Sequence, residues 1–150
     1  MSDVAYAGPL RPPLIYLASI IAGLLIEPVA FVPAALALPV GAALVALAIA
    51  LFVSSVLRFR AAGTPVPARQ PTTAIVRTGP FRISRNPIYL AFSLFHLGIA
   101  IWVDSAWLLA TLAGAVALMN WIVIPREERY LERRFGAEYA DYRASVRRWL

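Results

Sequence analysis

The stretch GPFRISRNPIYLAFSLFHLGIAIWV, residues 79–103, passes from a polar, proline-containing segment directly into a long apolar run. Arg82, Arg85 and Asn86 come before the run, and the next charged residue after Arg85 is Asp104. In a chain that is 61% hydrophobic and only 15% charged, such a run is typical of a helix that enters a membrane. The pattern raises the question of why two arginines lie directly before the apolar run.

Charged residues divide the rest of the chain into further apolar segments. Glu27 interrupts the first half of the chain, and Asp104 interrupts the second half. A helix needs about 20 predominantly apolar residues to cross a bilayer, and prolines mark turns. We therefore predict four membrane spans, at residues 13–32, 39–57, 88–103 and 106–124. Because the links at Pro33–Pro39 and at Asp104 are short, the sequence predicts an all-α integral membrane protein, a single domain over residues 1–150 made of two helical hairpins.

Arginine supplies all 14 basic residues of a chain whose net charge is +6. Both hairpin turns lack arginine, whereas the segment after the fourth span is rich in it. The segment between the second and third spans carries Arg58, Arg60, Arg69, Arg77, Arg82 and Arg85. By the positive-inside rule, this multi-pass chain has both termini and its central loop in the cytoplasm. Because the arginines flank apolar segments, we expect them to meet membrane lipids and expect no nucleic-acid partner.

The central segment, residues 58–87, is the predicted cytosolic loop. It contains Gly63, Pro65, Pro67 and Pro71, which make it too irregular for a helix. It is also longer than a simple connector, and long ordered loops in compact proteins are often functional. A floppy cytosolic loop would have the same composition, so the sequence leaves both interpretations open.

The cytosolic tail, residues 125–150, is predicted to be an amphipathic helix. Its large apolar side chains recur at helical spacing, at Leu131, Phe135, Tyr139, Tyr142, Val146 and Trp149. Such a face suits either an interfacial helix on the bilayer or a lid packed over the central loop, and periodicity cannot separate the two. Gly136 is a position at which the helix can divide in two.

Two adjacent carboxylates begin the tail. If the third and fourth spans form a hairpin, Glu127 and Glu128 come close to Arg85 and Asn86 at the cytosolic surface. The carboxylates then either form salt bridges with arginines or bind a cationic or hydroxyl-rich ligand. Spacing alone favours the salt bridges.

Other polar residues give weaker signals. Glu27 lies near the non-cytoplasmic end of the first span, where a carboxylate can reach lipid headgroups. His96 lies within the third span, where a single histidine more often hydrogen-bonds a neighbouring helix than acts in catalysis. The chain has no cysteine and one histidine, so we expect no metal site.

Two motifs carry a resemblance. GPFRISRNPIY, residues 79–89, resembles the G-P-Y-R-x-x-R-H-P-x-Y signature of the isoprenylcysteine carboxyl methyltransferase family and its phospholipid methyltransferase relatives. EERYLERRFGAEYADYRASVRRW, residues 127–149, is similar to that family's E-E-x-x-L-x-x-x-F-G-x-x-Y-x-x-Y-x-x-x-V-x-R pattern. The resemblance covers residues 72–149, and the first two spans match only in being hydrophobic.

The resemblance implies an enzyme that transfers a methyl group from S-adenosylmethionine to an amphiphilic, lipid-like acceptor, leaving S-adenosylhomocysteine. It implies cofactor binding on the cytosolic side, between the central loop and the start of the tail. The implied cofactor-binding positions are Thr73, Ala74, Ile75, Val76, Phe81, Arg85, Asn86, Pro87, Ile88, Tyr89, Glu127 and Glu128. Arg126 and Arg129 are the candidates for an acceptor-binding arginine, although their match to the family pattern is loose, and no catalytic residue is assigned.

The chemistry of these residue types is compatible with that cofactor. Arg85 can hold a carboxylate through two parallel hydrogen bonds, and a glutamate suits an ammonium group. The faces of Phe81 and Tyr89 can lie beside adenine or the sulfonium cation. Two positions depart from the family pattern, because Asn86 replaces its histidine and Phe81 its tyrosine. Asparagine cannot act as a base, so a mechanism that needs a histidine base at this position is excluded.

Three other functions compete with the methyltransferase. Four spans and Glu27 also fit a small multidrug-type transporter, although such proteins have minimal loops. A relative of the membrane sterol reductases would bind NADPH with a similar C-terminal part. A non-catalytic scaffold is the remaining alternative. The sequence indicates neither the acceptor nor the oligomeric state.

Overall fold

The computed structural model describes residues 11–65 and 71–150. The predicted position of the N-terminus, and Pro67 and Arg69 of the predicted loop, lie outside these residues. Regular structure in the described part is helical, apart from one isolated bridge between Ser84 and Arg147. The elements are α1 (Pro12–Leu24), α2 (Ala34–Ala61), a 3₁₀ turn (Gly79–Arg82), α3 (Pro87–Trp102), α4 (Ala106–Leu118), a π turn (Met119–Val123), α5 (Ile124–Phe135) and α6 (Ala137–Ser145).

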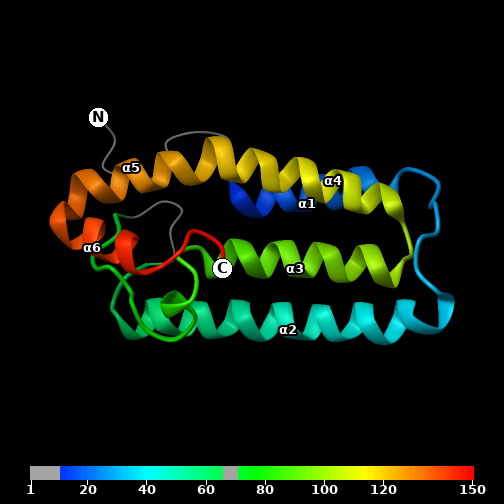
Figure 1. Ribbon diagram of the computed structural model, residues 1–150, viewed down its shortest axis with the longest axis horizontal. Helices are drawn as coiled ribbons and strands as arrows, with labels where there is room; N and C mark the ends of the chain where they lie inside the picture. Colours follow the sequence, from blue (N-terminus) through cyan, green and yellow to red (C-terminus); the bar gives the residue numbers. More distant parts are fainter. Residues whose placement is uncertain (1–10, 66–70) are drawn as a thin grey trace.

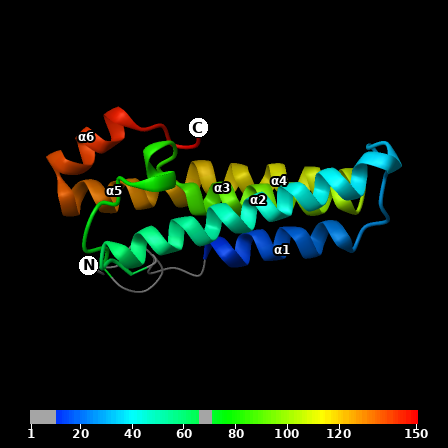
Figure 2. The same ribbon diagram turned by 90° about the horizontal axis from the view of Figure 1, so that it is seen from below.

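The helices α1, α2, α3 and α4 lie side by side in a bundle (Figure 1). The α2 helix packs along α3, and α1 packs along α4 and touches α3. Figure 2 shows α2 running obliquely across the bundle, with α5, α6 and the described part of the loop at one end. We call this end the cavity end, and the opposite end, with both hairpin turns, the turn end.

The outer surface of the bundle is apolar. Leu17, Leu47 and Ile49 are each more than half exposed, which in water would leave large apolar surfaces uncovered. Within residues 11–65 and 71–150, two segments are long and apolar enough to cross a membrane: α2, with 28 residues, and the continuous helix Ala106–Phe135, with 30. These features are those of a membrane protein, whereas α1 with 13 residues and α3 with 16 are shorter than a full span. Four spans therefore stay a prediction.

Helix ends near prolines differ from the prediction. The first helix ends at Leu24, not at residue 32, because a proline at 28 disfavours helical backbone at the residue before it. The predicted turn at Pro33–Pro39 is wrong after its first residue, because α2 begins at Ala34 and continues through Pro39. Pro39 lies in the second turn of α2, where it removes one backbone hydrogen bond without ending the helix. Helix α3 begins and ends within one residue of its predicted bounds.

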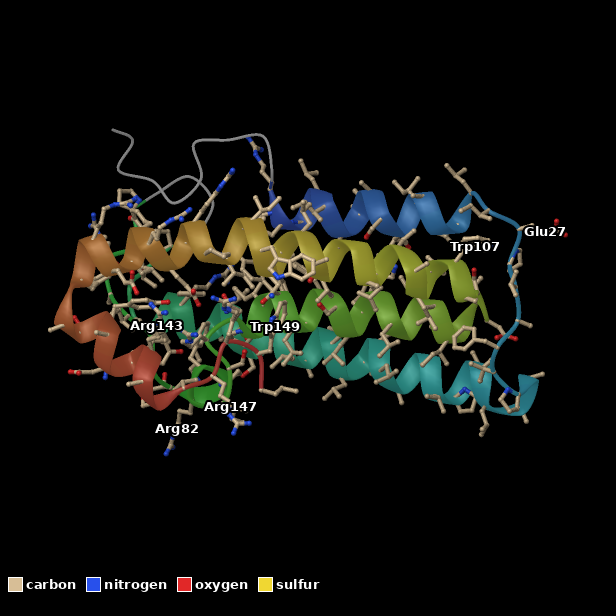
Figure 3. The ribbon with its side chains drawn as sticks, turned by 45° about the horizontal axis from the view of Figure 1, so that its top comes forward. Glu27, Arg82, Trp107, Arg143, Arg147 and Trp149 are labelled. Atoms are coloured by element: carbon tan, nitrogen blue, oxygen red, sulfur yellow. The ribbon has the colours of Figure 1, made fainter. Side chains whose placement is uncertain are left out.

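Asp104 joins the two hairpin turns at the turn end. Its backbone adopts a φ of 52°, and its Oδ1 accepts hydrogen bonds from the backbone N–H groups of Phe31 (2.7 Å) and Val32 (2.8 Å). The Ala106 N–H also donates to the Val29 carbonyl at 2.9 Å. Backbone groups in a linker without regular structure are satisfied in this way. Glu27 lies on the same linker, far from the cavity end (Figure 3).

The tail is not a single helix separate from the fourth predicted span. The α4 helix continues through the π turn into α5, and Pro125 does not end it. Gly136, with a φ of 52°, divides α5 from α6, as its position in the sequence allowed. Val146 and Trp149 lie beyond the end of α6, so the predicted six-residue apolar face is interrupted there.

The tail packs over the central loop. The Tyr142 hydroxyl donates to the Phe81 carbonyl at 2.8 Å, and Arg134 Nε donates to the Thr72 carbonyl at 2.5 Å. The Arg85 N–H donates to the Arg147 carbonyl at 2.9 Å. Of the two interpretations left open for the tail, these contacts support the lid, and they give the described part of the loop a fixed partner.

Candidate active site

A cavity of about 460 Å³ opens at the cavity end, between the loop, the start of α3, and helices α5 and α6. This volume falls within the range of about 300–1,000 Å³ that small-molecule sites occupy. Its walls are mainly apolar and aromatic, and the charged residues along them, within the described part of the chain, are Arg11, Arg85 and Glu127. The aromatic residues along its walls are Phe52, Phe59, Phe81, Tyr89, Phe92, Tyr130, Tyr139 and Tyr142.

Most of the cofactor-binding positions implied by the resemblance line this cavity. They are Ala74, Ile75, Val76, Phe81, Arg85, Asn86, Pro87, Ile88, Tyr89 and Glu127. The loop segment supplies the first four, and the 3₁₀ turn ends just before Arg85, so the chain enters α3 along the cavity wall. The prolines at 80 and 87 occupy the first turns of their helices, where the missing N–H has no helical partner.

Four other predicted site residues lie away from the cavity walls. Thr73 is exposed, and its groups bond Thr64 and Gly63 instead. Arg126 and Arg129 are exposed on the outer face of α5, so the structure brings neither to the cavity. Glu128 is the fourth. It points away from Glu127, which lines the cavity, because successive residues of an α-helix point about 100° apart.

Glu127 is buried and faces the cavity. It accepts a hydrogen bond of 2.8 Å from the Tyr89 hydroxyl on α3. This bond joins α3 to α5 and orients a carboxylate oxygen within a mainly apolar pocket. The question of which glutamate faces the cavity, which the sequence left open, is answered in favour of Glu127.

Glu128 belongs to a salt-bridge cluster instead. Its carboxylate lies 3.2 Å from Arg85 Nη2, and it accepts bonds of 3.1 and 2.6 Å from Arg148 Nε and Nη2. Arg85 Nη1 is 3.5 Å from the Tyr139 hydroxyl, and Arg85 Nε has no hydrogen-bond acceptor among the described residues. The salt-bridge alternative therefore describes Glu128, whereas Arg85 keeps a buried donor beside the cavity.

Asn86, at the position of the family's histidine, is held by the end of the chain. Its Nδ2 donates to the Arg148 carbonyl at 3.0 Å, and its backbone N–H donates to Ser84 Oγ at 3.1 Å. The side chain thus fixes the start of α3 while also lining the cavity.

The sequence pattern did not assign several residues that line or support the cavity. Tyr139 and Tyr142 were placed on the apolar face of the tail, but without a role at the site. Burial and the Glu128 charge raise the pKa of Tyr139 to about 12, and burial raises that of Tyr142 further. Both phenols stay protonated near neutral pH and can donate hydrogen bonds. Asn120, in the π turn, accepts hydrogen bonds from Arg148 and Trp149, and neither sequence motif predicted them.

A second, apolar cavity of about 290 Å³ lies between α1 and α2, along α3. It shares Pro13, Phe52 and Phe92 with the first cavity, so the two spaces are neighbours. Its floor includes Ala91 and Phe95 of α3, and its other walls are side chains of α1 and α2. We name this space the lateral groove.

His96 is apart from both cavities. It is fully buried between helices, with Nδ1 3.3 Å from Ser19 Oγ on α1 and Nε2 3.4 Å from Thr111 Oγ1 on α4. This arrangement is the interhelical hydrogen bonding that the sequence favoured for a lone histidine in an apolar helix.

Comparison with known families decides the relationship. A sequence profile described as phospholipid methyltransferase matches residues 36–138, which is more than half of the chain. This chain belongs to the phospholipid methyltransferase family. The resemblance read from residues 79–89 and 127–149 is thereby confirmed at the level of the family. The match begins within α2, so it includes a helix that the two motifs did not reach.

Relatives of this phospholipid methyltransferase family member have diverse names. An uncharacterized protein of Haemophilus influenzae is 40% identical over 65 residues, which are 42% of this chain and all of that protein. The nickel-cobalt-cadmium resistance protein NccN of Alcaligenes xylosoxydans xylosoxydans is 38% identical over 71 residues, 47% of this chain and 33% of its own length. The cobalt-zinc-cadmium resistance protein CzcN of Cupriavidus metallidurans is 38% identical over 68 residues, 45% of this chain and 31% of its own length.

The chain thus spans about a third of the two resistance proteins that it matches. No solved structure matches it. Within residues 11–65 and 71–150, no group of three or more potential metal-ligating side chains comes together.

Proposed function

We propose that this chain transfers a methyl group from S-adenosylmethionine to an amphiphilic acceptor that reaches the cavity from the membrane. The observation that carries the proposal is the joint lining of one cavity by Arg85 and Glu127, on segments of the chain that match the methyltransferase family. The cavity end carries the arginine-rich segments, so we place it, with both termini, on the cytoplasmic side of four spans.

The residues at the cavity suit the amino-acid end of S-adenosylmethionine. Its carboxylate is matched by Arg85, whose buried Nε lacks an acceptor among the described residues. Its ammonium group is matched by the Glu127 carboxylate, which Tyr89 orients. The aromatic rings of the cavity suit adenine and the sulfonium cation.

S-adenosylmethionine supplies an electrophilic methyl group, so the protein itself needs no covalent chemistry. The contribution of this chain is to orient two molecules and to exclude water from between them. Tyr142 and Arg134 hold the loop under the tail, which closes the cavity on its polar side. Asn86 cannot take up a proton, so it acts by fixing the start of α3.

The lateral groove suits the apolar part of the acceptor. Its walls are apolar, it lies between α1 and α2, and it adjoins the cavity at Phe52 and Phe92. An acceptor whose chain lies in this groove would present its polar end to the cavity, where the methyl group of the cofactor would lie. Phospholipid-like and prenyl-like acceptors share this chemistry, so the acceptor is proposed as a class.

The direct test is calorimetric titration of the purified protein in detergent with S-adenosylmethionine and, separately, with NADPH. We expect saturable binding of S-adenosylmethionine alone. Binding of NADPH instead would support the sterol-reductase alternative and overturn the proposal. A binding result would be followed by methyl transfer to lipids and prenylated thiols in mixed micelles.

The groove has its own test. Ala48 is almost fully buried at the groove wall, so Ala48→Phe should fill part of the space. We expect a higher KM for the apolar acceptor and an unchanged Kd for S-adenosylmethionine. Ala110→Phe, on an exposed position of α4, is the matched control. An unchanged KM in the Ala48 variant would contradict the proposed path.

A further inference from the structure

The last residues of the chain reach back to the cavity. We call residues 146–150 the C-terminal strap. The strap lies beside Ser84, and the Arg147 carbonyl accepts a bond of 2.9 Å from the Arg85 N–H. On its other side, Arg148 Nη1 donates to Asn120 Oδ1 at 3.1 Å, and Trp149 Nε1 donates to the same oxygen at 3.2 Å. The strap therefore joins the start of α3 to the π turn.

Within this arrangement, two guanidinium groups share one carboxylate. Arg148 contacts both oxygens of Glu128, through Nε at 3.1 Å and Nη2 at 2.6 Å. Arg85 contacts one of those oxygens, through Nη2 at 3.2 Å. A two-point contact between arginine and a carboxylate is stronger and more directional than a one-point contact. Glu128 is therefore held chiefly by Arg148.

This unequal sharing leaves Arg85 with donor capacity. Its side chain is 10% exposed, it lines the cavity, and its Nε has no acceptor among the described residues. A buried donor without an acceptor is costly, so an unpartnered guanidinium nitrogen beside a cavity indicates a site for an anionic ligand. If Arg148 were absent, Glu128 could turn fully toward Arg85 and satisfy it.

We propose that Arg148 is a positioning residue that makes the cavity selective for ligands with a carboxylate. It holds Glu128 in a two-point contact, so that Glu128 orients Arg85 without occupying its remaining donors. The ligand carboxylate then takes those donors. This inference rests on the proposed function, because it assigns the selectivity to the amino-acid end of S-adenosylmethionine.

The test compares two ligands that differ only in that group. S-adenosylmethionine and decarboxylated S-adenosylmethionine are titrated into the full chain in detergent, and the ratio of their Kd values is the readout. The wild type should prefer S-adenosylmethionine by roughly ten- to a hundredfold, as expected for hydrogen bonds to a charged group. Arg148→Gln should lower that preference by most of this factor and leave the Kd of the decarboxylated ligand unchanged.

Two further variants separate positioning from folding. In Arg148→Gln combined with Glu128→Gln, the competing carboxylate is also gone, so the preference should return toward that of the wild type. Arg147→Gln removes the same charge from the strap, but its exposed side chain projects outward (Figure 3), so it should change neither Kd. Thermal unfolding of each variant in detergent monitors the fold.

Three results would overturn the inference. Arg148→Gln would show a purely structural role if it weakened both ligands equally. The inference would also fail if the Kd ratio stayed at its wild-type value, or if the double variant lost more selectivity than the single one. Binding of S-adenosylmethionine with any of these results would leave the proposed function intact, whereas a wild type that binds neither ligand would overturn both.

Discussion

The two ends of the bundle differ in how completely their polar groups are hydrogen-bonded. At the turn end, Asp104 accepts two backbone hydrogen bonds and completes the linker between α1 and α2. At the cavity end, Arg85 lines the cavity, and its buried Nε has no acceptor among the described residues. A satisfied polar group stabilises a fold, whereas an incompletely satisfied one beside a cavity indicates a ligand. The difference is consistent with a structural role for the turn end and with the ligand site proposed at the cavity end.

The largest expected effect is at the cavity end. Arg85→Ala should weaken S-adenosylmethionine binding by roughly a hundredfold, because a charge-assisted contact is lost. Titration calorimetry measures the change, and Arg82→Ala is the control, since Arg82 is exposed and points away from the bundle (Figure 3). Equal binding by wild type and Arg85→Ala would show that Arg85 does not bind the ligand at the cavity end.

The next effect concerns the contact between α2 and α3. A Cβ added at Gly98 would lie 3.0 Å from the Gly41 carbonyl oxygen and 2.8 Å from Val45 Cγ2, so the two backbones approach closely there. Gly98→Leu should lower the free energy of unfolding by about 1–3 kcal/mol through overpacking. Thermal unfolding in detergent measures this loss. Gly114→Leu, where a Cβ meets nothing within 4 Å, is the matched control and should be tolerated.

A similar or smaller effect is expected at the turn end. Asp104→Ala leaves the N–H groups of Phe31 and Val32 without their acceptor, and it places alanine at a φ of 52°. Stability should fall by about 1–3 kcal/mol, with S-adenosylmethionine binding unchanged. Asp104→Asn keeps an acceptor oxygen and tolerates this backbone, so it should be milder. Weakened ligand binding in the alanine variant would show that the two ends are coupled.

The smallest effect is one of pH. The pKa of Tyr139 is raised to about 12 from its usual 10, so the folded state favours the protonated phenol. Its contribution to stability is therefore complete below pH 10 and is lost as the pH rises from 10 through 12. Unfolding temperatures should be insensitive to this group between pH 7 and 9 and should fall above pH 10. Tyr139→Phe should reduce that fall, and an identical alkaline profile would contradict it.

Periodicity and charge predicted much of the fold. The bounds of α3 follow from Pro87 at its start and Asp104 after its end, because both are strong local signals. The prediction at Pro39 was wrong because a proline in the second turn of a helix removes one hydrogen bond and need not end the helix. The end of α1 at Leu24 was missed because hydropathy continues past it to Ile26.

The cavity was predicted in part. Phe81 and residues 85–89 line it, because the chain passes along one wall of the cavity as it enters α3. The rotation of α5 decides that Glu127 faces the cavity and Glu128 the salt-bridge cluster, and sequence spacing alone does not give that rotation. The role of Arg148 depends on contacts across 20 or more residues, to Glu128 and Asn120, which local patterns do not encode.

The π turn Met119–Val123 has a consequence for how the chain could have evolved. A π turn holds about one residue more than an α-helical turn, and it arises where a helix gains a residue without rotating the segment that follows. A relative one residue shorter at this point could therefore keep the orientation of Glu127 toward its cavity. What it would lack is the extra residue of the turn that contains Asn120, the side chain to which Arg148 and Trp149 bind. The length of a single helical turn would thus decide whether such a relative can fasten the end of its chain beside its cavity.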